Sequence, residues 1–236
     1  MAHSSASATK RTLASSTHDA LRKEIIAGQI EADSRLNIRH LAARFEVGLA
    51  PIREALSRLS TEGLVTQTDH RGFTVVPVSV EELWDLHHAR VQLNALALRQ
   101  SIARGDAAWE ERIVVARHRL LRSKRPADDV FDPEADQWAM VHKDFHHALL
   151  SACESARILR YCDQLFDECE RYRHIARRVS TERPGVSEEH RAIAEAAIDR
   201  EADLAIELLT EHFRRTAERA EQGLVARAAG SVTAAD

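Results

Sequence analysis

The segment from residue 36 to residue 77 constrains the fold most, because helix and strand patterns follow one another there at short spacing. Its sequence is LNIRHLAARFEVGLAPIREALSRLSTEGLVTQTDHRGFTVVP. Apolar residues recur with a helical period and then with a strand period, so we expect two helices followed by two strands, at 38–45, 51–62, 64–68 and 73–76. Together with a helix expected over 17–28 and capped by Thr17, this pattern predicts a winged helix-turn-helix, which places a short helix in the DNA major groove.

Basic residues occur where such a motif meets DNA. Arg53 lies near the N-terminal end of the second helix of the pair, from which it can reach a phosphate or a guanine edge. Arg39 opens the first helix, and His70 and Arg71 lie at the expected wing tip, where a cation can enter the minor groove. Each of these side chains could instead be a solvated surface charge. Their placement within one motif favours the DNA-binding interpretation.

The run VGLAPIREALSRLSTEGLV, followed by RGFTV, resembles the DNA-binding domain of the GntR family of bacterial transcription regulators. The matching positions are Val47, Pro51, Ile52, Arg53, Glu54, Ala55 and Leu56. The chain departs from the family at Gly48, Leu49 and Ala50, where Ser-Arg-Thr is usual. The resemblance implies DNA binding. Because the missing arginine at Leu49 reads bases in the family, the usual half-site sequence is not carried over to this chain. The candidate DNA-binding residues are Arg39, Leu49, Arg53, His70, Arg71 and Gly72.

The remainder of the chain is expected to be an all-helical bundle of about six helices, so the whole chain is mostly α. Ser79 and Glu82 form a capping box that starts the first of these helices. Helical periodicity then predicts helices over 80–103, 106–121, 135–154, 156–179, 187–199 and 201–226. We expect a disordered tail over 1–12, a DNA-binding domain over 13–78, an effector-binding and dimerisation domain over 79–226, and a flexible tail over 227–236.

Charge and cysteine content agree with this division. Residues 1–78 hold 10 Lys/Arg and 8 Asp/Glu, whereas residues 79–236 hold 23 and 29, as suits a DNA reader joined to a domain that does not bind DNA. The three cysteines form no paired motif, and the polar N-terminus lacks the apolar core of a secretory signal. No apolar run approaches the roughly 18 residues needed to cross a membrane. A cytoplasmic protein without a membrane partner is therefore expected.

Four histidines of the helical part form a candidate metal site. His142 and His146 are four residues apart on one expected helix, a spacing that places both imidazoles on one face. His190 and His212 belong to two later helices and could converge with them in a bundle core. An all-imidazole set suits Zn²⁺, Ni²⁺ or Cu²⁺ better than Mg²⁺ or Ca²⁺. The alternative is that they are ordinary surface or core histidines, because the chain has 13 of them.

The order and context of these residues resemble the FCD ligand-binding domain of the FadR subfamily of GntR regulators, over about residues 13–224. In that family an Asp and a His four residues apart join two later histidines around a divalent metal; here His142 stands at the Asp position. The resemblance implies a divalent metal and a small organic acid as effector. Because imidazole donors favour softer ions, we expect zinc as the metal, with nickel as the other candidate. The candidate effector contacts are Arg90, Asn94 and Arg173. Arg90 matches a recurring FCD arginine, and Asn94 replaces a family Glu. Arg173 and the nearby Arg171 could bind a second carboxylate or could instead form a solvated helix face.

The leading hypothesis is therefore a transcription regulator, a repressor by family precedent, that binds a palindromic operator as a homodimer and responds to a small carboxylate. It is not expected to be an enzyme. A zinc enzyme acting on a small carboxylate is the alternative, although the helical part contains no HExxH motif. A non-catalytic scaffold with a structural metal is a further possibility.

Overall fold

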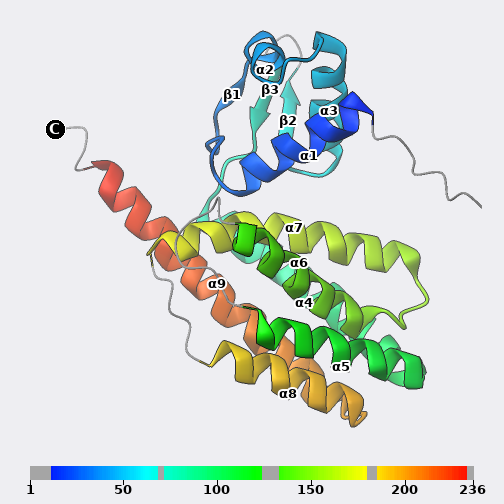
Figure 1. The fold of residues 1–236 in the computed structure, drawn as a ribbon. Helices are drawn as coiled ribbons and strands as arrows, with labels where there is room; N and C mark the ends of the chain where they lie inside the picture. The colour runs from blue at the N-terminus through cyan, green and yellow to red at the C-terminus, as the bar shows by residue number, and fades with distance from the viewer. Residues whose placement is uncertain (1–11, 69–71, 124–132, 180–184, 233–236) are drawn as a thin grey trace, which may run out of the picture. The chain divides into compact units, whose positions relative to one another are not determined.

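The computed structural model describes residues 12–68, 72–123, 133–179 and 185–232, and divides at Pro77 and Val78 into two compact units (Figure 1). The N-terminal unit contains helices α1 (Leu13–Ile26), α2 (Ile38–Arg44) and α3 (Leu49–Thr61), and strands β1 (Arg35–Leu36), β2 (Val65–Thr68) and β3 (Gly72–Val75). The strands form an antiparallel sheet in the order β1-β3-β2. The predicted winged helix-turn-helix is thus confirmed.

The core of this unit explains how α3 is held. Ile52, Leu56 and Leu59 lie on one face of α3 and are fully buried, while Leu21 of α1 and Val75 of β3 belong to the same apolar cluster. The opposite face of α3 is exposed. A helix anchored along one side by the hydrophobic effect is free to present its other side to a ligand.

Three details of the N-terminal unit differ from expectation. Helix α1 begins at Leu13 and its cap is Thr12, whose side chain accepts a hydrogen bond from the Ser15 N–H; Thr17 is buried inside the helix. Helix α3 begins at Leu49 with Gly48 as its N-cap, two residues earlier than expected, and Pro51 lies in its first turn as predicted. Strand β1 was not predicted, because a pairing of two residues leaves no periodic pattern in a sequence.

In the C-terminal unit the described residues form six helices: α4 (Val80–Arg104), α5 (Ala107–Arg122), α6 (Pro133–Leu150), α7 (Ala156–Val179), α8 (Val186–Ile198) and α9 (Ala202–Val232). The predicted all-helical bundle is confirmed. Ser79 caps α4 and Asp106 caps α5, each through a side-chain oxygen that accepts a backbone N–H. Helix α9 continues to Val232, so residues 227–232, expected in a flexible tail, are helical.

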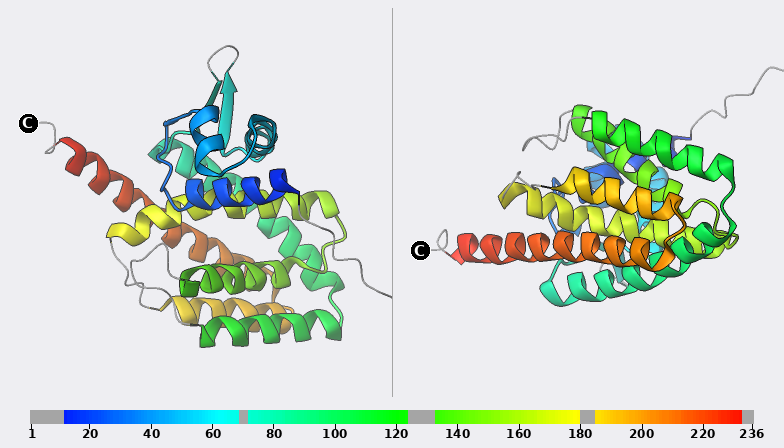
Figure 2. Two further views of the ribbon diagram at one scale, coloured as in Figure 1. Left: turned by 45° about the horizontal axis from the view of Figure 1, so that its top comes forward. Right: turned by 90° about the horizontal axis from the view of Figure 1, so that it is seen from below.

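Helix α9 organises the bundle by packing against α4, α7 and α8 (Figure 2). The main core is built from large side chains of several helices, including Trp109, Phe145, Leu149 and Ile193, all fully buried. Inward-facing positions of α6, α8 and α9 therefore meet inside the bundle. Among the described helices, none is both long and apolar enough to cross a membrane.

Candidate metal centre

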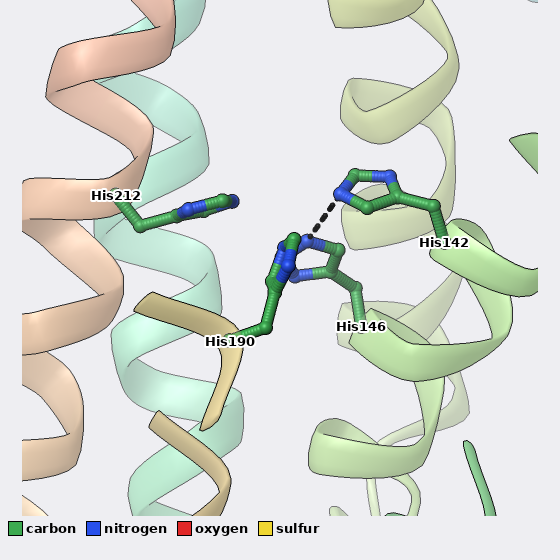
Figure 3. A group of neighbouring side chains, drawn as sticks. All are labelled: His142, His146, His190 and His212. Carbon is green, nitrogen blue, oxygen red and sulfur yellow. Dashed lines mark hydrogen bonds between the residues drawn. The ribbon is translucent and has the colours of Figure 1, made fainter. Parts of the chain in front are cut away.

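The four predicted histidines come together inside the bundle (Figure 3). His142 and His146 project from adjacent turns of α6, His190 from α8 and His212 from α9. Each is buried, with a relative exposure of 2–3%. One ring nitrogen from each residue lies within 4.8 Å of the ring nitrogens of the other three. Four imidazoles from three helices thus surround one small volume that is shielded from solvent.

The spacing of these nitrogens fits a single transition-metal ion. Two nitrogens bound to one ion at about 2.1 Å can be at most about 4.2 Å apart. A pair 4.8 Å apart would have to close by about 0.6 Å to bind as opposite ligands and by about 1.4 Å to bind at tetrahedral spacing. Unlike an oxygen-rich site, a set of imidazoles suits zinc, nickel or copper. The residues present thus fit such an ion both in geometry and in donor chemistry.

Aromatic rings enclose the cluster. The indole of Trp138 stacks on His142 with ring centroids 4.7 Å apart and planes inclined by 12°. Phe166 and Phe213 both lie 5.7 Å from the His146 ring centroid, and Phe145 lies 5.1 Å from that of His190. These contacts fix the imidazole orientations and exclude water, which strengthens electrostatic interactions at the site.

Burial also determines the protonation of the histidines. It lowers the pKa of His142 well below its usual value, and the positive charge of nearby Arg173 lowers it further. Burial likewise lowers the pKa of His146 well below its usual value, with Arg90 as the next cause. Both rings are therefore neutral near pH 7, which is the form that can donate a lone pair to a metal.

Arg90 of α4 lies beside this cluster in an unusual environment. It is only 4% exposed, and its guanidinium carbon lies 3.8 Å from the Phe213 ring centroid and 5.2 Å from that of Phe166. Within the part of the chain that the structure describes, no carboxylate forms an ion pair with it, and its buried Nε makes no hydrogen bond. A buried guanidinium without an anionic partner is costly, so this position favours an incoming anion.

The other predicted effector residues have different surroundings. The Asn94 side chain donates a hydrogen bond to the Arg90 backbone carbonyl at 2.9 Å, so its amide N–H is used within α4. Arg173 of α7 contacts His142, with Nη1 2.9 Å from Nδ1, and forms an ion pair with Glu170. Arg171 is buried rather than on a solvated helix face, and burial lowers its pKa. Arg90 and Arg173 are both cations whose charge lowers the pKa of a histidine in the cluster.

In the N-terminal unit the predicted DNA contacts that can be placed are exposed. Arg39 is the second residue of α2, Arg53 lies in α3, and Leu49, the first residue of α3, is 45% exposed. Gly72 opens β3 with φ +87°, a conformation that favours glycine. The wing-tip residues His70 and Arg71 lie outside the described residues.

Sequence reasoning missed Glu189 as a neighbour of the histidines, and it predicted Trp138 only as a core or pocket-wall residue. Glu189 of α8 lies with Oε2 2.8 Å from Nδ1 of His212, and Trp138 covers His142. Trp138 is four residues before His142, so a helical spacing could have indicated their contact. Glu189 directly precedes His190, but its partner belongs to another helix, and sequence spacing carries no signal of such a contact.

A winged helix-turn-helix joined to a helical bundle with a buried ligand-type site defines a class of DNA-binding transcription regulators. Comparison with known families agrees: residues 13–75 match the gntR family of bacterial regulatory proteins, and residues 85–215 match the FCD domain. The chain belongs to the GntR family and carries the FCD domain of its FadR subfamily.

Individual relatives support this assignment. The HTH-type transcriptional regulator BphR of Paraburkholderia xenovorans is 40% identical over 87% of this chain and 84% of its own. The HTH-type transcriptional repressor GlaR of Escherichia coli is 34% identical over 82% of this chain and 89% of its own. These relatives are regulators, not enzymes, so the zinc-enzyme alternative is set aside.

Solved structures show the same fold at lower sequence identity. E. coli McbR/YncC aligns with a TM-score of 0.72 at 18% identity, covering 90% of this chain and 99% of its own. A GntR regulator from Rhodococcus sp. RHA1 aligns with a TM-score of 0.66 at 20% identity, covering 88% and 96%. The arrangement of the helices is therefore one that related regulators use.

Proposed function

We propose that this protein is a cytoplasmic repressor that binds a palindromic operator as a homodimer and is switched by a small carboxylate. The carboxylate binds in the bundle at a divalent metal, zinc or alternatively nickel, held by His142, His146, His190 and His212. The observation that carries this proposal is the buried guanidinium of Arg90, which lies beside four buried imidazoles and has no carboxylate partner among the described residues.

The charges of the site favour an anion. The metal would add two positive charges and, with coordination positions left open, would accept a carboxylate oxygen. Imidazole ligands carry no negative charge that could offset those charges, and Arg90 and Arg173 add to them. Glu170 offsets Arg173 through its ion pair. A bidentate carboxylate would neutralise Arg90, whose planar fork matches its geometry. The faces of Phe166 and Phe213 hold the guanidinium in place for that contact.

Arg53, on the exposed face of α3, would contact the DNA major groove. The DNA backbone or minor groove would be contacted by Arg39 and by the wing residues His70, Arg71 and Gly72. One winged helix reads few base pairs, and two copies related by a two-fold axis read a palindrome. Repression is favoured because the relative GlaR is named a repressor. The carboxylate would act by binding one arrangement of the dimer more tightly than another, which shifts their populations.

A thermal-unfolding screen of small mono- and dicarboxylates tests the proposal, using Zn²⁺-loaded and chelator-treated protein in parallel. A carboxylate at 100 times its dissociation constant should stabilise the folded state by about 2.7 kcal/mol. For a chain of this size the midpoint should rise by roughly 5–10 °C. The rise should disappear after chelation and in Arg90→Ala, but remain in Arg99→Ala, which removes an exposed arginine of the same helix.

The active carboxylate should then change operator affinity in a fluorescence-anisotropy titration. If no carboxylate stabilises the Zn²⁺-loaded protein, the effector proposal is wrong. If chelation unfolds the bundle while carboxylates have no effect, the ion is structural instead. If the carboxylate binds but leaves operator affinity unchanged, the proposed switch is wrong.

A further inference from the structure

Glu189 joins two of the helices that supply histidines. It lies on α8 directly before His190, and its carboxylate contacts α9 twice. Oε2 lies 2.8 Å from Nδ1 of His212, and Oε1 lies 3.0 Å from Nη1 of Arg215. The side chain is mostly buried, at 14% exposure. One carboxylate thus holds both an imidazole of the candidate metal site and the arginine three residues further along α9.

The chemistry of this contact determines which nitrogen of His212 is available. An ionised carboxylate only accepts hydrogen bonds, so Nδ1 of His212 must carry the proton and donate it. In the neutral ring the lone pair is then on Nε2. Figure 3 shows the His212 ring pointing from α9 toward the other three histidines. The nitrogen at the far end of the ring is therefore the one prepared to bind a metal.

Arg215 contributes by keeping Glu189 in place. Its guanidinium also contacts Glu211, with Nε 2.7 Å from Oε1, so it is itself anchored to α9. The contact with Arg215 is a charge-assisted hydrogen bond, and it fixes the orientation of the Glu189 carboxylate. The His212 imidazole is thus held in one tautomer and one orientation by a chain of contacts that starts on its own helix.

We infer that Glu189 is a positioning residue of the metal site: it fixes the Nδ1–H tautomer of His212 so that Nε2 binds the ion. This inference rests on the proposed metal site. A metal-binding histidine has one N–H, on the ring nitrogen that does not bind the ion. A carboxylate that accepts a hydrogen bond from it raises the basicity of the ring, and loss of the carboxylate typically lowers metal affinity by about 10–100-fold. Because Glu189 is adjacent to His190, one turn of α8 supplies one ligand and orients another.

The test compares Glu189→Ala and Glu189→Gln with the control Glu188→Ala, which removes an exposed carboxylate of the same turn of α8 that pairs with Arg191. Zn²⁺ affinity is measured by competition with a chelator. The tautomer of His212 is measured in metal-free protein by ¹⁵N chemical shifts of ¹⁵N-histidine-labelled samples, with the signal assigned by its loss in His212→Ala.

We expect Glu189→Ala to weaken Zn²⁺ binding by about 10–100-fold and to mix the two tautomers of His212. Glu189→Gln keeps an accepting oxygen but loses the charge, so the tautomer should persist with a smaller loss of affinity, and this variant serves if the alanine variant does not fold. Glu188→Ala should resemble wild type in both measurements. Wild-type affinity and tautomer in Glu189→Ala would overturn the role of Glu189 alone, whereas a wild-type protein that does not bind Zn²⁺ would overturn the metal site as well.

Discussion

The Nε2 atoms of His142 and His146 lie 3.2 Å apart on adjacent turns of α6. Around an ion with bonds of about 2.0–2.1 Å, neighbouring ligands are separated by about 2.8–3.0 Å at right angles, as in a six-coordinate site with open positions, and by about 3.3–3.4 Å at the tetrahedral angle. These two nitrogens are therefore already spaced as neighbouring ligands of one ion. His142 stands where the FCD resemblance implies an aspartate, so the pair also determines which ion the site prefers.

His142→Asp should change metal preference. A carboxylate in place of an imidazole adds a negative charge and a hard oxygen donor, which suits Mn²⁺ better than the softer ions that favour imidazole. We expect the ratio of Mn²⁺ to Zn²⁺ affinity to rise by about tenfold or more, which corresponds to about 1.4 kcal/mol. Competition titrations with both ions measure this ratio. His118→Asp, at an exposed position of α5, is the control; an equal ratio in the two variants would contradict the prediction.

Arg173→Gln should strengthen metal binding. Arg173 only donates hydrogen bonds, and its Nη1 lies 2.9 Å from Nδ1 of His142, so it favours the tautomer with the lone pair on Nδ1. Binding an ion through Nε2 requires the other tautomer and the loss of this contact. The glutamine removes a nearby positive charge and can accept a proton from Nδ1, while its N–H groups can still face Glu170.

We expect Zn²⁺ affinity to rise by roughly tenfold in Arg173→Gln, since a hydrogen bond to a charged group is worth about 1.5–3 kcal/mol. Affinity for the carboxylate should fall, because one of the two cations beside the site is gone. The chelator competition and the carboxylate titration measure these two effects separately. Weaker Zn²⁺ binding would show that Arg173 supports the ion rather than competing with it.

Most of the fold could be predicted from the sequence because its elements have local signals. Ser79 and Asp106 are followed by helical periodicity, and the structure places a cap at each. Local signals failed where the chain offered alternatives: Thr12 and Thr17 are both suitable caps, and only packing decides that Thr17 is buried. The two-residue strand β1 exists only through its pairing with β3, which no local pattern encodes.

The candidate site divides in the same way. The four histidines could be singled out from spacing and family resemblance, and the structure brings them together. The contacts of Arg173 with His142 and of Glu189 with His212 join different helices, over 31 and 23 residues of sequence. Such contacts depend on the rotation of each helix about its axis, which is determined by packing of the bundle. They therefore required the three-dimensional structure.

Gly105→Ala should destabilise the helical unit. A Cβ atom at this position would overlap the Trp109 indole and lie 2.8 Å from the Ser101 carbonyl oxygen. Trp109 is fully buried and cannot move aside without disturbing the core. Overpacking of this kind costs about 1–3 kcal/mol, or roughly 2–12 °C in the midpoint of thermal unfolding.

Gly48→Ala is the matched control for this prediction. A Cβ atom at position 48 would lie 3.8 Å from Cδ of Pro51, which is an ordinary van der Waals contact. The backbone φ of −68° at this position is one that alanine readily adopts. Because alanine is less favourable than glycine at an N-cap, calorimetry should show at most a small fall in the midpoint for Gly48→Ala and a larger fall for Gly105→Ala. Equal midpoints would mean that α4 and α5 adjust at their junction without cost.

Leu49→Arg should alter DNA recognition. Leu49 is the first residue of α3 and is 45% exposed, and the family resemblance places a base-reading arginine there. A guanidinium at the N-terminal end of the recognition helix can form a bidentate contact with a guanine edge, worth about 1–3 kcal/mol of discrimination. Selection from random DNA should therefore yield a half-site with a new guanine preference, whereas the wild-type protein should show none at that position.

The control for this change is Leu13→Arg, which adds the same charge at an exposed position of α1. An added charge that contacts only phosphate strengthens binding to all DNA sequences. It also makes the slope of a plot of log affinity against log salt concentration more negative by about one. A base contact instead changes the ranking of sequences. If Leu49→Arg and Leu13→Arg select the same half-site as wild type, the first residue of α3 does not face a base, and recognition depends on Arg53 and the wing.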